Sequence, residues 1–157
     1  MVSRCGKLPA SVAERQAKAA ISALRPRGVE LVKTDVSLED SVSPGSSVLV
    51  SLAGDGFYLG GDSIGARGKP AEIVGREAAE SFLSAFASGA RADAHLADML
   101  APVLCLSESP SKLLIPFVTE HLKTSLSVAK LFTSADFGFE HRGDADLLSI
   151  SPRQQNS

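Results

Sequence analysis

The feature that most constrains the fold is a pair of helical segments with short apolar strands between them. Residues 10–24 repeat apolar side chains at the spacing of an α-helix, and the proline and glycine that follow end this pattern. Strands are predicted at 29–36, 48–52 and 57–59, and a second helix at 70–87. A strand cut short at Met1 would precede this group. The first part of the chain therefore predicts an α/β unit of about ninety residues.

Glycine-rich turns separate these elements. Gly54-Asp55-Gly56 predicts a tight hairpin turn, because glycine and aspartate tolerate positive φ angles. Residues 60–68 predict a glycine-rich loop, which does not fit the P-loop pattern because Pro70 follows Lys69 where serine or threonine is needed. A mobile connection between strand and helix is the simpler interpretation of this loop. Arg67 and Lys69 nevertheless offer point charges to a phosphate backbone.

The rest of the chain predicts a second group of elements. They are helices at 93–101 and 119–132, a strand at 111–117, and a hairpin of strands at 136–140 and 146–150. Pro102 is expected to kink or end the first of these helices. The polar tail, residues 151–157, is expected to be disordered. We therefore expect two domains, residues 1–90 and 91–150.

Composition and charge exclude several classes of protein. Lys plus Arg number 16 against 18 Asp plus Glu, a net charge of -2, whereas a protein that coats nucleic acid carries a basic excess. The longest apolar runs, such as Leu113 to Val118, are too short to cross a bilayer, and no signal-peptide pattern opens the sequence. Cys5 and Cys105 stand alone and fit neither a disulfide framework nor a metal site. A cytoplasmic protein with no membrane partner is expected.

One histidine has a local setting that suggests chemistry. If Thr119 caps the helix that follows it, Glu120 and His121 occupy the first helical turn. The free N–H groups and the positive end of the helix dipole then lie beside the imidazole, which favours its neutral form and an adjacent phosphate. A neutral histidine beside a phosphate can attack phosphorus. Taken alone, an exposed histidine at a helix start is more often an ordinary surface residue.

A second group of polar side chains lies on the helix predicted at 93–101. His95, Asp98 and Met99 fall on one face of that helix, opposite its apolar residues. An imidazole, a carboxylate and a thioether could line a nucleotide pocket, but a solvent-exposed face is the simpler interpretation. The residues alone therefore indicate an α/β protein with one suggestive histidine, and they do not indicate a reaction.

Several stretches, taken together and in order, resemble the RNA 3'-terminal phosphate cyclase family. They are GKLPASVAER at 6–15, SPGS at 43–46, GFYLGGDSIGARGK at 56–69, AHLADML at 94–100 and TEHLKTS at 119–125. The resemblance implies an α/β (α+β) fold with a thioredoxin-like small insert domain at residues 1–90. Residues 91–150 would then be the end of the catalytic large domain, part of a βαβαββ-type repeat.

The same resemblance implies an activity and a site. Such cyclases use ATP and a divalent metal, Mg²⁺ or Mn²⁺, to convert an RNA 3'-phosphate into a 2',3'-cyclic phosphodiester. On the motif match, His121 is the nucleophile that becomes adenylylated. No residue of this chain is assigned as a metal ligand. The residues that the match places at the nucleotide are Tyr58, His95, Leu96, Ala97, Asp98 and Met99.

Two departures from the family qualify this interpretation. Met99 stands where the family has glutamine, so a hydrogen-bonding amide is lost. Family members are also much longer, and their N-terminal part, with a metal-binding glutamate and the arginines that hold the RNA phosphate, has no counterpart here. We therefore expect the isolated chain to be inactive or weakly active. Apolar side chains on the last helix or the last hairpin are expected to be exposed.

Because the N-terminal part of the family has no counterpart here, the resemblance implies partners for this chain and leaves alternative functions open. The expected partners are RNA 3'-phosphate ends, together with a second copy of the chain in a homodimer or a separately encoded N-terminal half. One alternative is a non-catalytic cyclase-like scaffold in ribosomal RNA processing. Another is a plain thioredoxin-fold interaction module, without redox chemistry because no Cys-x-x-Cys motif is present.

Overall fold

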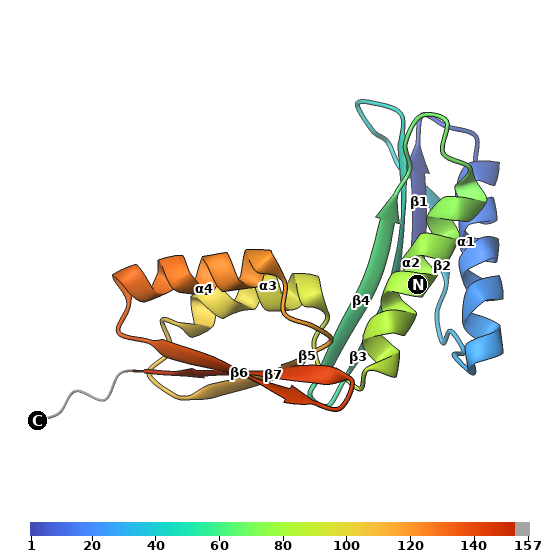
Figure 1. Ribbon diagram of the computed structural model, residues 1–157. Helices are drawn as coiled ribbons and strands as arrows, with labels where there is room; N and C mark the ends of the chain where they lie inside the picture. The colour runs from blue at the N-terminus through green and yellow to red at the C-terminus, as the bar shows by residue number, and fades with distance from the viewer. Residues whose placement is uncertain (153–157) are drawn as a thin grey trace, which may run out of the picture. The chain divides into compact units, whose positions relative to one another are not determined.

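The computed structural model describes residues 1–152, which form two compact units (Figure 1). Unit 1 comprises residues 1–52 and 60–84, and unit 2 comprises residues 53–59 and the chain from residue 85 onward. Residues 53–59 and 85–90 thus belong to unit 2, whereas the sequence places them in the domain expected at residues 1–90. Both units mix helices with strands, and each has its own sheet, so the predicted α/β class is confirmed.

The first part of the chain has the order strand, helix, three strands, helix. Its elements are β1 (Val2–Gly6), α1 (Ser11–Leu24), the short 3-10 helix η1 (Arg25–Arg27), β2 (Asp35–Leu38), β3 (Gly45–Gly54), β4 (Phe57–Ile64) and α2 (Ala71–Ala87). The sheet order is β2-β1-β3-β4, with β1 parallel to β2 and antiparallel to β3. In Figure 1 both helices lie on the same side of this sheet.

Buried and exposed side chains alternate along the strands, which matches a sheet that the two helices cover on one face only. Val48 and Val50 of β3 are buried, whereas Leu49 between them is 43% exposed. Because successive side chains point to opposite faces, the valines pack under the helices and the leucine lies on the open face. The buried side chains that the helices contribute are mostly small: Ala13, Ala17, Ala20 and Leu24 of α1, and Val74, Ala78, Ala79 and Phe82 of α2.

Two predictions for the first part are corrected by the structure. The strand expected at 29–36 is only Asp35–Leu38, because Asp35 pairs with Val2 at the start of β1 and residues 29–34 lie before this ladder. Residues 60–64 belong to β4 and not to a loop. A Cβ on Gly61 would lie 2.2 Å from the Phe82 backbone nitrogen, so glycine is needed here because α2 approaches the strand closely.

The elements of unit 2 that follow α2 are two helices and three strands. They are α3 (Ala94–Leu104), β5 (Ser111–Ile115), α4 (Glu120–Phe132), β6 (Asp136–Arg142) and β7 (Ala145–Ser151). The sheet order is β5-β7-β6, and both pairings are antiparallel. This α-β-α-β-β order matches the last five elements of the βαβαββ-type repeat that the resemblance implies.

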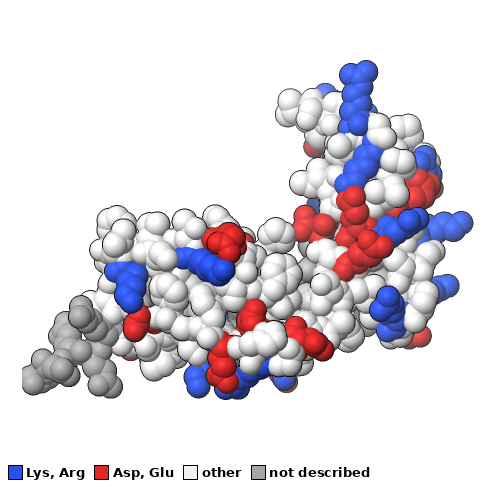
Figure 2. All heavy atoms as spheres, in the orientation of Figure 1, with Lys and Arg blue, Asp and Glu red and all other residues white. Residues whose placement is uncertain are grey.

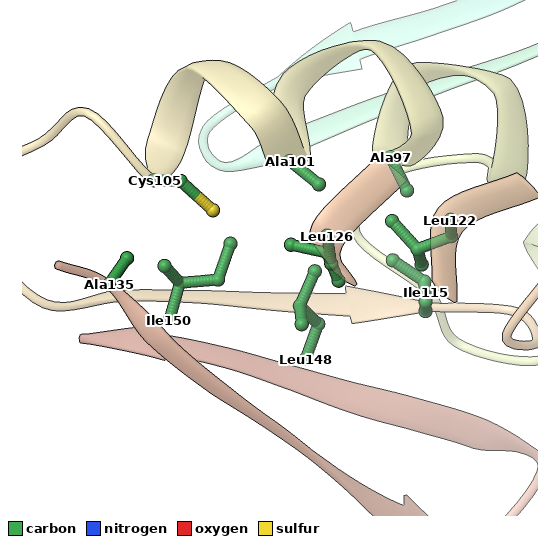
Figure 3. Close-up of a cluster of buried hydrophobic side chains, with 9 residues drawn as sticks. All are labelled: Ala97, Ala101, Cys105, Ile115, Leu122, Leu126, Ala135, Leu148 and Ile150. Atoms are coloured by element: carbon green, nitrogen blue, oxygen red, sulfur yellow. The ribbon is translucent and has the colours of Figure 1, made fainter. Parts of the chain in front are cut away.

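A hydrophobic cluster holds unit 2 together, and Figure 3 shows its side chains gathered between the helices and the sheet. Helix α4 contributes Leu122 and Leu126, which are fully buried and one turn apart. The remaining members are Ala97, Ala101, Cys105, Ile115, Ala135, Leu148 and Ile150. By contrast, Leu131 and Phe132 at the end of α4 are 79% and 84% exposed, which agrees with the prediction of exposed apolar side chains on the last helix.

Two boundaries in unit 2 differ from the prediction. Pro102 lies inside α3, which continues to Leu104. Proline removes one backbone donor, but Cys105 beyond it packs into the cluster and its N–H donates to the Ala101 carbonyl at 3.1 Å, so the helix persists. Ser151 is not part of a disordered tail, because it pairs with Asp136 at the end of β7. Residues 153–157 of the predicted tail lie outside the described residues.

Candidate nucleotide and catalytic site

The start of α4 exposes His121 beside a side-chain cap. Thr119 has extended backbone angles, and its Oγ1 accepts a hydrogen bond from the Leu122 N–H at 2.9 Å. Glu120 and His121 are therefore the first two residues of the helix, and both are exposed. The Leu122 side chain that follows is fully buried and anchors this turn to the cluster. The predicted cap is confirmed, and His121 faces solvent from the amino end of the helix.

A second hydrogen bond joins the two predicted segments of the site. The Thr119 hydroxyl donates to Oδ1 of Asp98 in α3 at 2.7 Å. One threonine hydroxyl therefore acts as an acceptor within α4 and as a donor toward α3. The resemblance does not decide whether Asp98 would orient a ribose or the imidazole. In the structure one of its oxygens holds the cap, so its first role is to fix the start of α4 against α3.

Another carboxylate holds the residue before the cap. Oδ2 of Asp146 in β7 accepts from the Val118 N–H at 3.2 Å, and its Oδ1 lies 2.8 Å from His141 Nδ1. The two aspartates thus bind adjacent positions, 118 and 119, just ahead of His121. Asp146 has no role predicted from the sequence, although it is the charged residue near the start of an otherwise uncharged strand.

The segment 95–99 presents only some of its predicted residues to solvent. His95 is exposed and Met99 is 74% exposed, whereas Leu96 is half-buried. Ala97 is fully buried and points into the hydrophobic cluster (Figure 3). The Ala97 methyl group therefore packs against the core of unit 2.

Tyr58 lies beside the start of α3 through backbone pairing. Its N–H donates to the Arg91 carbonyl at 2.7 Å, and its carbonyl accepts from the Asp93 N–H at 3.3 Å. Asp93 is the N-cap of α3, since its side chain accepts from the Leu96 N–H at 2.9 Å. Tyr58 itself is 59% exposed. The structure thus brings Tyr58 close in space to the segment that carries His95.

The charges near His121 are few. Glu120 pairs with Lys123 at 2.6 Å on the exposed side of α4, and Asp98 is the carboxylate bound to the cap. Within residues 1–152, no three His, Cys, Asp or Glu side chains are grouped so that they could hold a metal ion. The Mg²⁺ or Mn²⁺ that the resemblance implies therefore has no ligand cluster in the described part of the chain.

The double role of the Thr119 hydroxyl leads to a prediction. Thr119→Val keeps the shape of the side chain but removes both hydrogen bonds, so we expect it to lower the free energy of unfolding by about 1–2 kcal/mol. Thr119→Ser keeps the hydroxyl and should lose much less. Urea unfolding followed by circular dichroism measures both variants. Equal midpoints for valine and serine would contradict the assigned role of the hydroxyl.

Comparison with known proteins agrees with this architecture. Residues 1–87, more than half of the chain, match the family described as RNA 3'-terminal phosphate cyclase (RTC), insert domain. The chain therefore belongs to the RNA 3'-terminal phosphate cyclase family. Proteins named RNA 3'-terminal phosphate cyclase are 38% identical in Pyrobaculum neutrophilum, 42% in Caldivirga maquilingensis and 42% in Pyrococcus abyssi.

The matches cover most of this chain but less than half of each relative. They cover 95%, 96% and 88% of this chain, but only 43%, 44% and 40% of the respective relatives. The chain thus spans less than half the length of the curated relatives it matches. In the part that the structure describes, no helix combines the length and the apolar character needed to cross a membrane.

Proposed function

We propose that this chain supplies the nucleophilic histidine of an ATP-dependent RNA 3'-phosphate cyclase, and that His121 is this residue. The observation that carries the proposal is the placement of His121 at the start of α4, exposed and next to a cap that Asp98 holds. The amino end of a helix favours a bound phosphate, so it can hold one beside an imidazole that attacks phosphorus.

The proposed reaction has three steps. An imidazole nitrogen of His121 attacks the α-phosphorus of ATP, forming a phosphorus–nitrogen bond while the bond to pyrophosphate breaks. An oxygen of the RNA 3'-phosphate then takes the adenylyl group from His121, which regains its free imidazole. Finally the neighbouring 2'-hydroxyl attacks the activated phosphate, closes the 2',3'-cyclic phosphodiester and releases AMP.

The residues around His121 have positioning and binding roles in this proposal. Asp98 and Asp146 fix residues 118 and 119 and thereby the direction in which His121 points. The exposed side chains of His95 and Met99 on α3, with Tyr58 beside the start of that helix, offer surfaces to the adenine. A divalent ion bound to the triphosphate would neutralise its charge and assist the departure of pyrophosphate.

The proposal assigns the complete reaction to an assembly larger than this chain. A single nucleophile gains little rate without groups that position the substrates and stabilise the developing charge. The other groups would come from the region that the relatives have and this chain does not cover, supplied by a separate polypeptide. In a homodimer, a second copy would cover the exposed apolar side chains at the end of α4 but would not supply these groups. A cytoplasmic location belongs to the same proposal.

A chimera tests this proposal. In it, the chain replaces the matching region of the Pyrobaculum neutrophilum cyclase, and the substrate is an RNA with a 3'-phosphate, supplied with ATP and Mg²⁺. We expect the chimera to form cyclic ends and the isolated chain to be slower by at least about 100-fold, because it lacks the positioning groups. Equal rates for chain and chimera would contradict the need for the missing region. A chimera that folds but forms no cyclic ends would contradict the proposed activity.

A further inference from the structure

A cavity of about 460 Å³ lies within unit 1, apart from the residues assigned above. Its walls come from the start of α1, residues 44–46 before and at the start of β3, and the connection at 65–71 that leads into α2. Figure 1 shows that the amino ends of both helices lie at the same end of unit 1. The volume falls within the range of about 300–1,000 Å³ that small-molecule sites usually have.

The charged side chains that line this cavity are all cationic. They are Arg15, Arg67 and Lys69, and no Asp or Glu is among the lining residues. Figure 2 shows lysine and arginine side chains at this end of unit 1, with acidic side chains next to them. Because the cavity has cations on its walls and no carboxylates, its ligand should be an anion.

Two of the three cations are already paired with carboxylates outside the lining. Arg15 binds Glu72 through two hydrogen bonds of 2.7 and 3.1 Å, and this contact lowers the pKa of Glu72 to about 2. Lys69 binds Glu77. Arg67 is exposed and has no hydrogen bond or ion pair with another residue in the range 1–152. Arg67 is therefore the cation with its full donor capacity free.

The remaining walls of the cavity are apolar side chains and a glutamine that a hydrogen bond holds in place. Leu8, Val12, Pro44 and Pro70 supply apolar surface. The amide of Gln16 is fully buried, and its Nε2 donates to Ser46 Oγ at 2.7 Å, so this wall is held in place. The N-cap residue of α1 is Ala10, which provides no side-chain acceptor to the first turn. The Val12 N–H already donates to the Pro9 carbonyl at 2.9 Å, so an anion beside α1 would rely on the other first-turn donors, which have no competing side-chain cap.

We propose that this cavity binds a nucleotide, with the phosphate at Arg67 and the amino end of α1 and the sugar or base against the apolar wall. Guanidinium groups and helix amino ends both favour phosphate, and the apolar wall suits the body of a nucleotide better than a bare anion. The nucleotide can be free or one unit of an RNA strand. This site does not depend on the catalytic role of His121.

Binding measurements on the 157-residue chain, without ATP or Mg²⁺, test the proposal. The probe is a short fluorescein-labelled single-stranded RNA followed by anisotropy, with AMP and inorganic phosphate as competitors. Arg67→Glu should weaken RNA binding by roughly tenfold to hundredfold, because a charge-assisted contact to phosphate is replaced by repulsion. The matched control is Arg27→Glu, which makes the same charge change on the exposed η1 beyond the other end of α1 and should leave binding nearly unchanged.

The competitors separate the sources of the ligand. Displacement of the RNA by AMP, with inorganic phosphate much weaker, supports a nucleotide site that accepts free nucleotides. Displacement by unlabelled RNA alone, still sensitive to Arg67→Glu, supports a site for a nucleotide unit within a strand. Equal loss of binding in Arg67→Glu and Arg27→Glu, or equal competition by AMP and inorganic phosphate, would overturn the proposal. The His121 proposal is judged by labelling with ATP, so the failure of one does not imply the failure of the other.

Discussion

Replacing His121 by alanine in the chimera is expected to reduce labelling of the protein by α-labelled ATP by at least about 10³-fold. The variant has no imidazole to form the phosphorus–nitrogen bond, and removal of a covalent nucleophile is among the largest single losses that an enzyme shows. Because His121 is exposed, the substitution removes no buried contact, and the variant should fold as the unsubstituted chimera does. Gel analysis of the labelled protein measures the effect.

The control for this prediction is Lys112→Ala. Lys112 is also an exposed residue of unit 2, but it lies on β5 and has no role in holding the start of α4. Its loss should leave labelling close to that of the unsubstituted chimera. If His121→Ala is labelled and forms cyclic ends as well as the unsubstituted chimera, the nucleophile is elsewhere. Retained function in ribosomal RNA processing by His121→Ala would favour the alternative of a non-catalytic scaffold.

Replacing Leu126 by alanine is expected to lower the free energy of unfolding of unit 2 by about 3 kcal/mol, within the range of about 2–5 kcal/mol found for buried leucines. Leu126 is fully buried in the cluster between α4 and the sheet, so its truncation removes apolar burial and leaves a cavity. Urea unfolding followed by circular dichroism gives the free energy from the midpoint and slope.

Leu131→Ala is the matched control, because it makes the same truncation on the same helix at a side chain that is 79% exposed. We expect this control to change the free energy of unfolding by no more than about 0.5 kcal/mol. An equally small change in both variants would contradict the packing of Leu126 against the sheet. A loss in Leu131→Ala as large as that in Leu126→Ala would indicate that a partner or a second copy covers the end of the helix.

The elements with strong periodicity could be predicted from the sequence. The helix at 119–132 has a capping threonine, buried leucines one turn apart and a polar opposite face, and each of these features is local. The turn at 54–56 was equally predictable, because Gly56 adopts a φ of 75° that glycine tolerates readily. For the same reason the position of His121 at the start of a helix followed from the sequence.

Features that depend on contacts distant in the sequence could not be predicted. The sequence predicts a loop at Gly61, yet this residue lies in β4. Glycine is needed there because α2 packs directly on the strand. Pro102 predicts a break in the helix, yet α3 continues past it because Cys105 packs into the hydrophobic cluster. The bonds from Asp98 to Thr119 and from Asp146 to Val118 join residues 21 and 28 positions apart, and no local pattern announces such pairs.

The most direct test of the account is to find where the adenylyl group is attached. The chimera is incubated with ATP and Mg²⁺ without RNA, digested under conditions that preserve phosphorus–nitrogen bonds, and analysed by tandem mass spectrometry. The account predicts one AMP on the imidazole of His121, released when RNA with a 3'-phosphate is added. AMP attached to another residue, such as His95 or a lysine, and discharged by the same RNA would contradict it.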